Sequence, residues 1–119
     1  MKRDMELIRS LLLAIEENAH DYKLQNYNLD AVRYHEALLI EAGLVVGSIS
    51  QELGTTEYPY VKIFKLTWSG HEFIDNIRED RLWSTIKCNF KEASFSTIMN
   101  VSKELAEGYA KKKVKELLN

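Results

Sequence analysis

The 119-residue sequence has little of several residue types, and each shortage excludes a class of protein. Its one cysteine, Cys88, cannot form a disulfide within the chain, which favours a reducing, cytoplasmic setting. No apolar run approaches the ~18 residues that a membrane span needs, and no signal-peptide pattern opens the chain, so we expect no membrane association. With one proline and five glycines, most of the chain can form regular structure.

Neither sign of charge is in large excess, because 16 Lys and Arg residues against 18 Asp and Glu residues give a net charge of −2. This balance argues against a protein that coats nucleic acid without regard to sequence. Hydrophobic residues make up 45% and charged residues 29%, which is typical of a globular protein. The length corresponds to a single domain, over residues 1–119.

Hydrophobic spacing predicts two helices in the first third of the chain. The first covers residues 4–17 with Asp4 as its N-cap and an exit turn at Asn18. The second runs from an N-cap at Asn28 to about Ala42, and Gly43 follows at a position where a positive φ ends a helix. Residues 20–28 fit either a short strand or a helical turn.

The rest of the chain predicts a hairpin and further helices. Residues 44–50 and 58–66 are rich in β-branched and aromatic residues, and the glycine-containing connector 51–57 suits a hairpin tip. Thr67 can cap a helix over 68–77, a further helical stretch follows, and Ser94 or Ser96 opens a last helix with Gly108 inside it. Four aromatic residues are expected to pack in the core and wing and not to form a ligand cage, although an aromatic patch on one side could anchor a partner protein. They are Tyr58, Tyr60, Trp68 and Trp83.

The second helix and the hairpin together resemble a winged helix-turn-helix domain. The helix end, residues 38–45, leads at once into the hairpin, as a recognition helix leads into its wing. The segment Leu66-Thr67-Trp68-Ser69-Gly70-His71-Glu72-Phe73-Ile74 is similar to one that follows the wing in several bacterial winged-helix regulators. The predicted fold is α+β, mostly α: a winged helix-turn-helix with a β-hairpin wing (residues 1–78) and added C-terminal helices (residues 79–119).

A closer resemblance covers essentially the whole chain, to a bacterial and phage family catalogued as domain of unknown function 2513. It implies a winged-helix architecture and frequent occurrence in prophage-type genomes, and it implies no activity. The residues that carry it are Met1 to Arg9, Leu12 to Glu17, Tyr34-His35, Leu38-Leu39, Glu41 to Leu44, Tyr58 to Val61 and Leu66 to Phe73.

A DNA-binding interpretation places cations against phosphates and side chains of the second helix at base edges. On that helix we expect an outward stripe of Asp30, Arg33, Tyr34, Ala37 and Glu41, and a core side of Ala31, Val32, His35, Leu38, Leu39 and Ala42. Arg33 and Tyr34, beside Ala37, are the candidates for base contacts. Lys62 and Lys65, with Lys2 or Arg3, are the candidates for phosphate contacts.

The charge of this helix opposes that interpretation. Arg33 stands against the three acidic residues Asp30, Glu36 and Glu41, so the helix has a net charge of −2. Two functions remain open: a phage- or prophage-type DNA-binding or transcription-regulator-like protein, or a protein–protein interaction module that keeps the winged-helix shape. A continuous positive potential across Arg33, Tyr34, Lys62 and Lys65 would favour the first.

The last helix is basic near its end and carries apolar residues at helical spacing. Its lysines are expected to form a solvated face with i to i+4 pairs such as Glu107 with Lys111. The apolar residues either pack within the chain or form a homodimer contact, which would give two recognition helices a palindromic DNA site. They are Ile98, Val101, Leu105, Val114 and Leu117.

No motif for catalysis or metal binding is complete, so we expect no enzyme, no metal and no cofactor. Residues 71–75 begin like a His-Glu-x-x-His zinc motif, but Asp75 stands where the second histidine belongs, and zinc sites need three or four ligands. His71 is therefore expected to be part-buried or capping, and His35 to be a packing histidine. Cys88 has no neighbouring histidine, so nucleophilic chemistry is unsupported.

Overall fold

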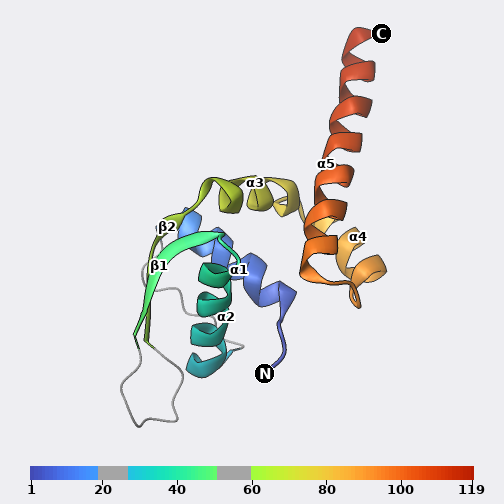
Figure 1. Ribbon diagram of the computed structural model, residues 1–119. Coiled ribbons are helices and arrows are strands. Elements are labelled where there is room, and N and C mark those ends of the chain that lie inside the picture. Colours follow the sequence, from blue (N-terminus) through green and yellow to red (C-terminus); the bar gives the residue numbers. More distant parts are fainter. Residues whose placement is uncertain (19–26, 51–59) are drawn as a thin grey trace. The chain divides into compact units, whose positions relative to one another are not determined.

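The computed structural model describes residues 1–18, 27–50 and 60–119 (Figure 1). Within these residues it is mostly helical with one antiparallel two-stranded hairpin, an α+β winged-helix-like layout with added C-terminal helices, as the sequence predicts. The predicted hairpin tip, residues 51–57, and most of 20–28 lie outside the described residues. The elements are α1 (Met5–Glu16), α2 (Leu29–Glu41), β1 (Val45–Ser50), β2 (Tyr60–Leu66), α3 (Trp68–Ile77), α4 (Asp80–Phe90) and α5 (Phe95–Leu118).

The chain divides into two compact units, Met1–His71 and Glu72–Asn119. The first unit holds α1, α2, the hairpin and the start of α3, and the second holds the rest of α3 with α4 and α5. The sequence predicts a single domain made of a winged-helix core, residues 1–78, and a C-terminal extension, residues 79–119, and this organisation stays a prediction. Among the described residues, no helix is both long enough and apolar enough to cross a membrane.

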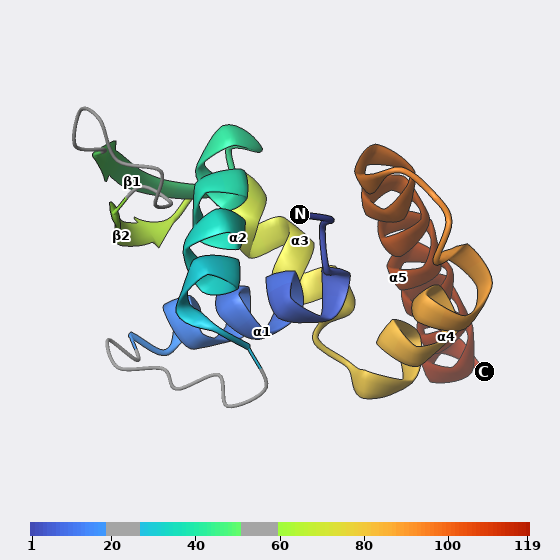
Figure 2. The same cartoon turned by 90° about the horizontal axis from the view of Figure 1, so that it is seen from below.

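The start of α1 is set by Asp4, as predicted. One carboxylate oxygen of Asp4 accepts hydrogen bonds from the backbone N–H groups of Glu6 and Leu7, at 3.0 and 3.2 Å. These bonds satisfy donors that have no partner inside the helix. One face of α1 is buried, and α1 packs against α2 and β2 in the first unit (Figure 2). The buried residues of α1 are Leu7, Ile8, Leu11 and Leu12.

The junction between α2 and the hairpin is closed by Gly43 and Thr67. Asn28 caps the start of α2, and Gly43 ends it with a φ of +74°, both as predicted. The Thr67 hydroxyl donates to the Gly43 carbonyl at 2.6 Å and accepts from the Gly70 N–H at 3.0 Å. The Thr67 N–H also donates to the Leu44 carbonyl. Thr67 therefore ties the two ends of the hairpin together and caps α3.

The hairpin contains a β-bulge at Phe64. Val46 pairs with Lys65 and Gly47 with Ile63, which leaves Phe64 as the extra residue of β2. Side chains of a strand alternate between its two faces, so residues 61 and 66 would lie on opposite faces of a regular strand. Because of the extra residue, Val61 and Leu66 are both buried.

The second unit is organised by the packing of α4 against α5. The buried side chains are Trp83 and Ile86 of α4 and Ile98 and Ser102 of α5. Ser94 is the N-cap of α5, since its hydroxyl accepts from the Thr97 N–H at 3.2 Å. Residues 107–119 are all exposed, and Figure 1 shows this half of α5 continuing past α4.

Several side chains differ in burial from the sequence expectation. Ala42 is exposed because α2 ends one residue earlier, and His71 is also exposed. Tyr60 is exposed because its neighbour Val61 takes the buried face of the strand.

Trp68 is exposed because Gly70, about 200° away on the helix, is the residue that faces Leu44. Burial is confirmed for Trp83.

Candidate nucleic-acid interface

Two of the predicted phosphate- or base-contacting cations lie beside aromatic rings of β2. The guanidinium carbon of Arg33, on α2, is 5.8 Å from the centre of the Tyr60 ring. The ammonium nitrogen of Lys62 is 5.6 Å from the centre of the Phe64 ring. Both distances lie within the ~6 Å range of cation–π attraction. The ring of Tyr60 thus links a cation of α2 to the strand that carries Lys62.

The two strands of the hairpin add positive charge without opposing acids. Lys62 and Lys65 are both exposed, and Val45–Ser50 and Tyr60–Leu66 contain no Asp or Glu. The bulge places Lys65 beside Phe64, with both side chains exposed. The strand β2 therefore presents exposed lysines and exposed aromatic rings on its surface. Lys2 and Arg3 are exposed as well.

Tyr34 and Ala37, the other predicted site residues of α2, are half-buried. The Tyr34 ring packs edge-on against the imidazole of His35, with centroids 5.4 Å apart and planes at 79°. Part of the Tyr34 ring therefore serves packing, which narrows the surface it can offer to a ligand. Ala37 offers only a methyl group.

Fewer acidic residues of α2 are exposed than its sequence contains. Glu36 is buried, with 8% of its surface exposed, where the sequence interpretation counted it among the charges that interrupt a positive face. The exposed acids are Asp30 and Glu41, which lie at the two ends of the helix. Of these two, Asp30 lies one turn before Arg33 on the helix, and Glu41 lies about two turns after it.

A polar cluster at the start of α1 fixes α2 in place. His35 is buried, its Nδ1 lies 2.7 Å from the Ala31 carbonyl, and its Nε2 accepts the Asp4 N–H at 2.8 Å. A neutral imidazole with its proton on Nδ1 satisfies both contacts. Burial raises the pKa of the Tyr27 hydroxyl, and the charge of Asp4 and a hydrogen bond to its carboxylate raise this pKa further. His35 is thus a satisfied packing histidine, as predicted, but its bond to Asp4 had no signal in the sequence.

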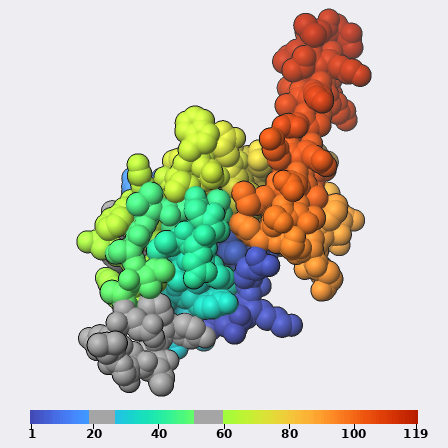
Figure 3. Space-filling model, in the orientation of Figure 1, coloured from blue at the N-terminus to red at the C-terminus, as the bar shows by residue number. Residues whose placement is uncertain are grey.

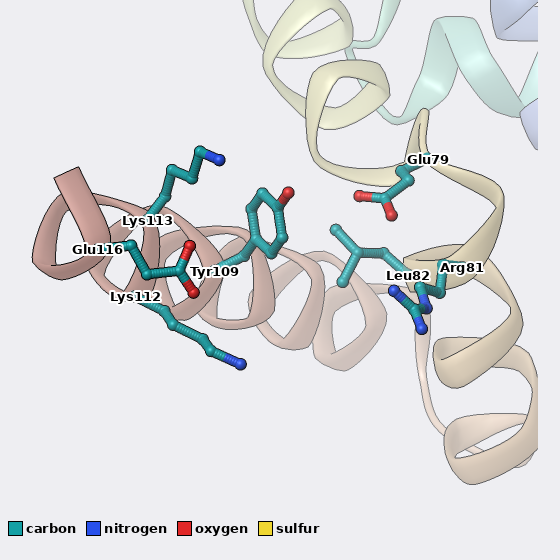
Figure 4. A pocket seen from close by; sticks show the side chains of 7 residues that line it. All are labelled: Glu79, Arg81, Leu82, Tyr109, Lys112, Lys113 and Glu116. Atoms are coloured by element: carbon teal, nitrogen blue, oxygen red, sulfur yellow. The ribbon is translucent and has the colours of Figure 1, made fainter.

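In the second unit, a cavity of about 300 Å³ opens between α4 and α5 (Figure 4). Tyr109 and Leu82 face each other across it, while the ends of Lys112 and Lys113 diverge. The lining mixes both signs of charge and has no converging polar groups of the kind that hold a substrate. Its lining residues are Glu79, Arg81, Leu82, Tyr109, Lys112, Lys113 and Glu116.

The incomplete zinc motif lies on the surface. Asp75 is exposed and forms an ion pair with Arg78 at 2.8 Å. Throughout the part of the chain that the structure describes, no three His, Cys, Asp or Glu side chains are grouped closely enough to hold a metal ion. Cys88 is exposed and free.

The five predicted dimer residues do not share one face of α5. Ile98 is buried and Val101 and Leu105 are half-buried, whereas Val114 and Leu117 are exposed. Ile98 and Val114 are sixteen positions apart, which separates them by about 160° around the helix axis. The first three therefore lie in the packed half of the helix and the last two in its exposed half.

Comparison with known proteins agrees with the pattern of residues noted in the sequence. The sequence profile of the family described as "Hypothetical protein (DUF2513)" matches residues 2–96. The chain belongs to this family. The DUF2513 match spans α1 to α4 and ends at the first turn of α5. An uncharacterized protein of Haemophilus influenzae is 32% identical over 113 residues, covering 90% of this chain and 93% of that protein. No solved structure matches the chain.

Proposed function

We propose that this DUF2513 protein is a cytoplasmic, phage- or prophage-type DNA-binding protein of the transcription-regulator kind and not an enzyme. The observation that carries the proposal is the placement of Arg33 beside the Tyr60 ring and of Lys62 beside the Phe64 ring, on the strand that also carries Lys65. A recognition-type helix and a wing thereby contribute cations to one surface. The burial of Glu36 removes one acid from that surface.

Duplex DNA is the partner that suits this arrangement. An α-helix fits the major groove, where a guanidinium can bond guanine edges, and α2 carries Arg33, which is half-buried, in its second turn. The Tyr60 ring holds that guanidinium in place, which lowers the entropy lost on binding. Lys62 and Lys65 are then available to phosphates on the flank of the groove.

The test is a salt titration of binding to duplex fragments from upstream of the protein's own gene. Affinity should fall linearly with salt on logarithmic axes, because bound cations release counterions from the DNA. The double variant Lys62→Ala/Lys65→Ala should lower the magnitude of the slope by about two, since about one unit is lost per phosphate contact. Arg33→Ala should reduce the preference for one fragment over another.

The matched control is Lys111→Ala/Lys112→Ala, which removes the same charge from the exposed half of α5. It should leave the slope within a few tenths of the wild-type value. Absence of salt-sensitive binding at low ionic strength, or equal slopes for both double variants, would contradict the proposal.

A specific observation also favours the alternative, a protein-interaction module. Residues Ala106, Ala110, Val114 and Leu117 follow one another at helical spacing, and the last three are exposed. We call them the apolar stripe of α5. The half of α5 from residue 107 onward buries no apolar face, and an isolated helical segment of this length is marginal in water, so a partner on the stripe would stabilise it.

Charge indicates that the partner is a second copy of the chain. Along α5, the stretch with Lys103, Glu104 and Glu107 has a net charge of −1, and the stretch with Lys111, Lys112, Lys113, Lys115 and Glu116 has a net charge of +3. In an antiparallel pair, the acidic stretch of one copy lies beside the basic stretch of the other, whereas a parallel pair opposes like charges. An antiparallel homodimer through the apolar stripe is therefore the favoured form of this alternative, and it is compatible with DNA binding.

Sedimentation velocity over a range of protein concentrations tests the dimer. Wild-type protein should associate as its concentration rises, and Val114→Gln/Leu117→Gln should stay monomeric. Lys112→Gln, about 160° from Val114 on the helix, is the control and should associate like the wild type. A monomeric wild-type protein at all concentrations would exclude the dimer.

A further inference from the structure

Three aromatic side chains in residues 60–68 lie open to solvent. The exposed fractions are 60% for Tyr60, 56% for Phe64 and 81% for Trp68. All three belong to the first unit, and we call them the aromatic strip. Three rings this exposed in one short segment give it apolar surface that a partner can cover.

Cations surround the aromatic strip, and acids are missing from it. Lys62 and Lys65 alternate with the rings along the segment, and Arg33 reaches the Tyr60 ring from α2. Residues 60–68 contain no Asp or Glu. A partner for this surface needs flat apolar groups to cover the rings and negative charges at regular intervals between them. Nucleotides supply both, as bases and phosphates.

The spacing of the rings favours bases that are not stacked on one another. Tyr60 and Phe64 are four residues apart on β2, which is about 13 Å along an extended strand. Stacked bases of a duplex are 3.4 Å apart and expose no faces to a protein ring. Bases that cover these rings must therefore be splayed out, as they are in a single strand.

We infer that the aromatic strip binds single-stranded DNA, with bases stacked on its rings and phosphates held by Arg33, Lys62 and Lys65. The inference goes beyond the proposed reading of duplex DNA by α2, because a duplex offers the rings no bases. Arg33, Lys62 and Lys65 serve both binding modes, so a single strand and a duplex compete for this surface.

The chain carries its own fluorescent reporter for the test. Trp68 is 81% exposed and Trp83 is 2% exposed, so quenching of tryptophan emission by an unlabelled oligonucleotide reports base stacking on Trp68. The probe is oligothymidylate, compared with its duplex with oligoadenylate, at low ionic strength. The single strand should bind and quench the emission, and the duplex should leave it unchanged. In Trp68→Leu, where only the buried Trp83 remains, quenching should be lost.

Fluorescence anisotropy with labelled oligothymidylate measures the contribution of each ring. Phe64→Ala should weaken binding by about fivefold to a hundredfold, the range expected when one stacked base is lost. Phe64→Tyr, which keeps a ring, should bind like the wild type. Tyr109→Ala removes an equally exposed ring from α5 and should also bind like the wild type. Circular dichroism confirms that each variant is folded.

The outcomes separate this inference from the proposed function. Duplex binding without single-strand binding would overturn the inference and leave the proposed function standing. Binding of the single strand alone would support the inference and overturn the reading of duplex DNA. If Phe64→Ala and Trp68→Leu are folded and bind oligothymidylate as tightly as the wild type, the aromatic strip is not the site.

Discussion

His35 joins two helices through both nitrogens of its ring. One nitrogen meets a carbonyl of its own helix, and the other accepts the N–H of Asp4, which is also the cap of α1. One buried side chain therefore fixes both the start of α1 and the placement of α2. Arg33 lies only two residues before His35, so the position of the candidate base-contacting residue depends on this bond.

Replacing His35 by phenylalanine should lower the free energy of unfolding by about 1–3 kcal/mol, because the Asp4 N–H loses its acceptor in a part-buried place. Urea denaturation measures the change. His71→Phe is the control, since His71 is exposed and its replacement should change stability by no more than about 0.5 kcal/mol. Equal effects of the two substitutions would show that the bond to Asp4 contributes nothing.

Tyr27 gives the fold a dependence on alkaline pH. Folding raises the pKa of its hydroxyl above the ordinary 10.0. The stability contributed by the neutral hydroxyl is therefore complete below pH 10.0 and is lost as the pH rises through the higher pKa of the folded state. The free energy of unfolding can be measured by urea denaturation at several pH values from about pH 8 to about pH 11. At about pH 11 the wild-type protein should lose stability relative to the Tyr27→Phe variant. A constant difference between the two proteins would contradict this.

At the scale of elements, the boundaries of α1 and α2 could be predicted because their signals are local. Asp4, Asn28 and Gly43 each act within a few residues of their own position. The start of α5 was narrowed to two serines, and the structure shows it to be Ser94. The order of helices and the hairpin followed from the same kind of local pattern.

The features that sequence could not reveal depend on contacts between elements. The bulge at Phe64 arises from how two strands pair, and the burial of Glu36 from what covers α2. The candidate site was found in part, since Arg33, Lys62 and Lys65 were named from charge. The ring of Tyr60 that links Arg33 to β2 was missed, because an aromatic residue in a strand is ordinarily a packing residue.

Replacing either of two helical glycines by alanine should change the stability of the fold, in opposite directions at the two positions. A Cβ at Gly70 of α3 would collide with the backbone carbonyl oxygen of Leu44, whereas a Cβ at Gly108 of α5 would meet nothing. Gly70→Ala should destabilise the fold by more than 1 kcal/mol, roughly the low end of overpacking costs. Gly108→Ala should stabilise α5 by roughly 0.5–1 kcal/mol through helix propensity. Thermal unfolding of both variants measures this, and a shift of the same sign in each would refute it.

At the scale of the whole molecule, a near-neutral net charge conceals an uneven distribution. The strands of the hairpin carry only basic charges, and the exposed half of α5 is basic too. Both segments can be found by their sequence colours in the space-filling view (Figure 3). The net charge therefore does not indicate where the charged surfaces of the chain lie. The placement of a few cations beside rings, at Tyr60 and Phe64, is more informative.

Removing residues 107–119 should leave the remaining fold intact, because every residue in that segment is exposed. At a concentration where the full chain is monomeric, the shortened chain should unfold at the same temperature, followed through the fluorescence of buried Trp83. Self-association should disappear. A lower unfolding temperature would mean that the segment holds part of the core together.

The closure of the hairpin by Thr67 bears on how members of this family can diverge. Because its hydroxyl and N–H bind Gly43 and Leu44, the spacing of the strands where they leave α2 and enter α3 is set at the base. Residues can then be gained or lost in the connection 51–59 without displacing α2 or α3. The length of this connection is therefore free to vary separately from the stability of the fold.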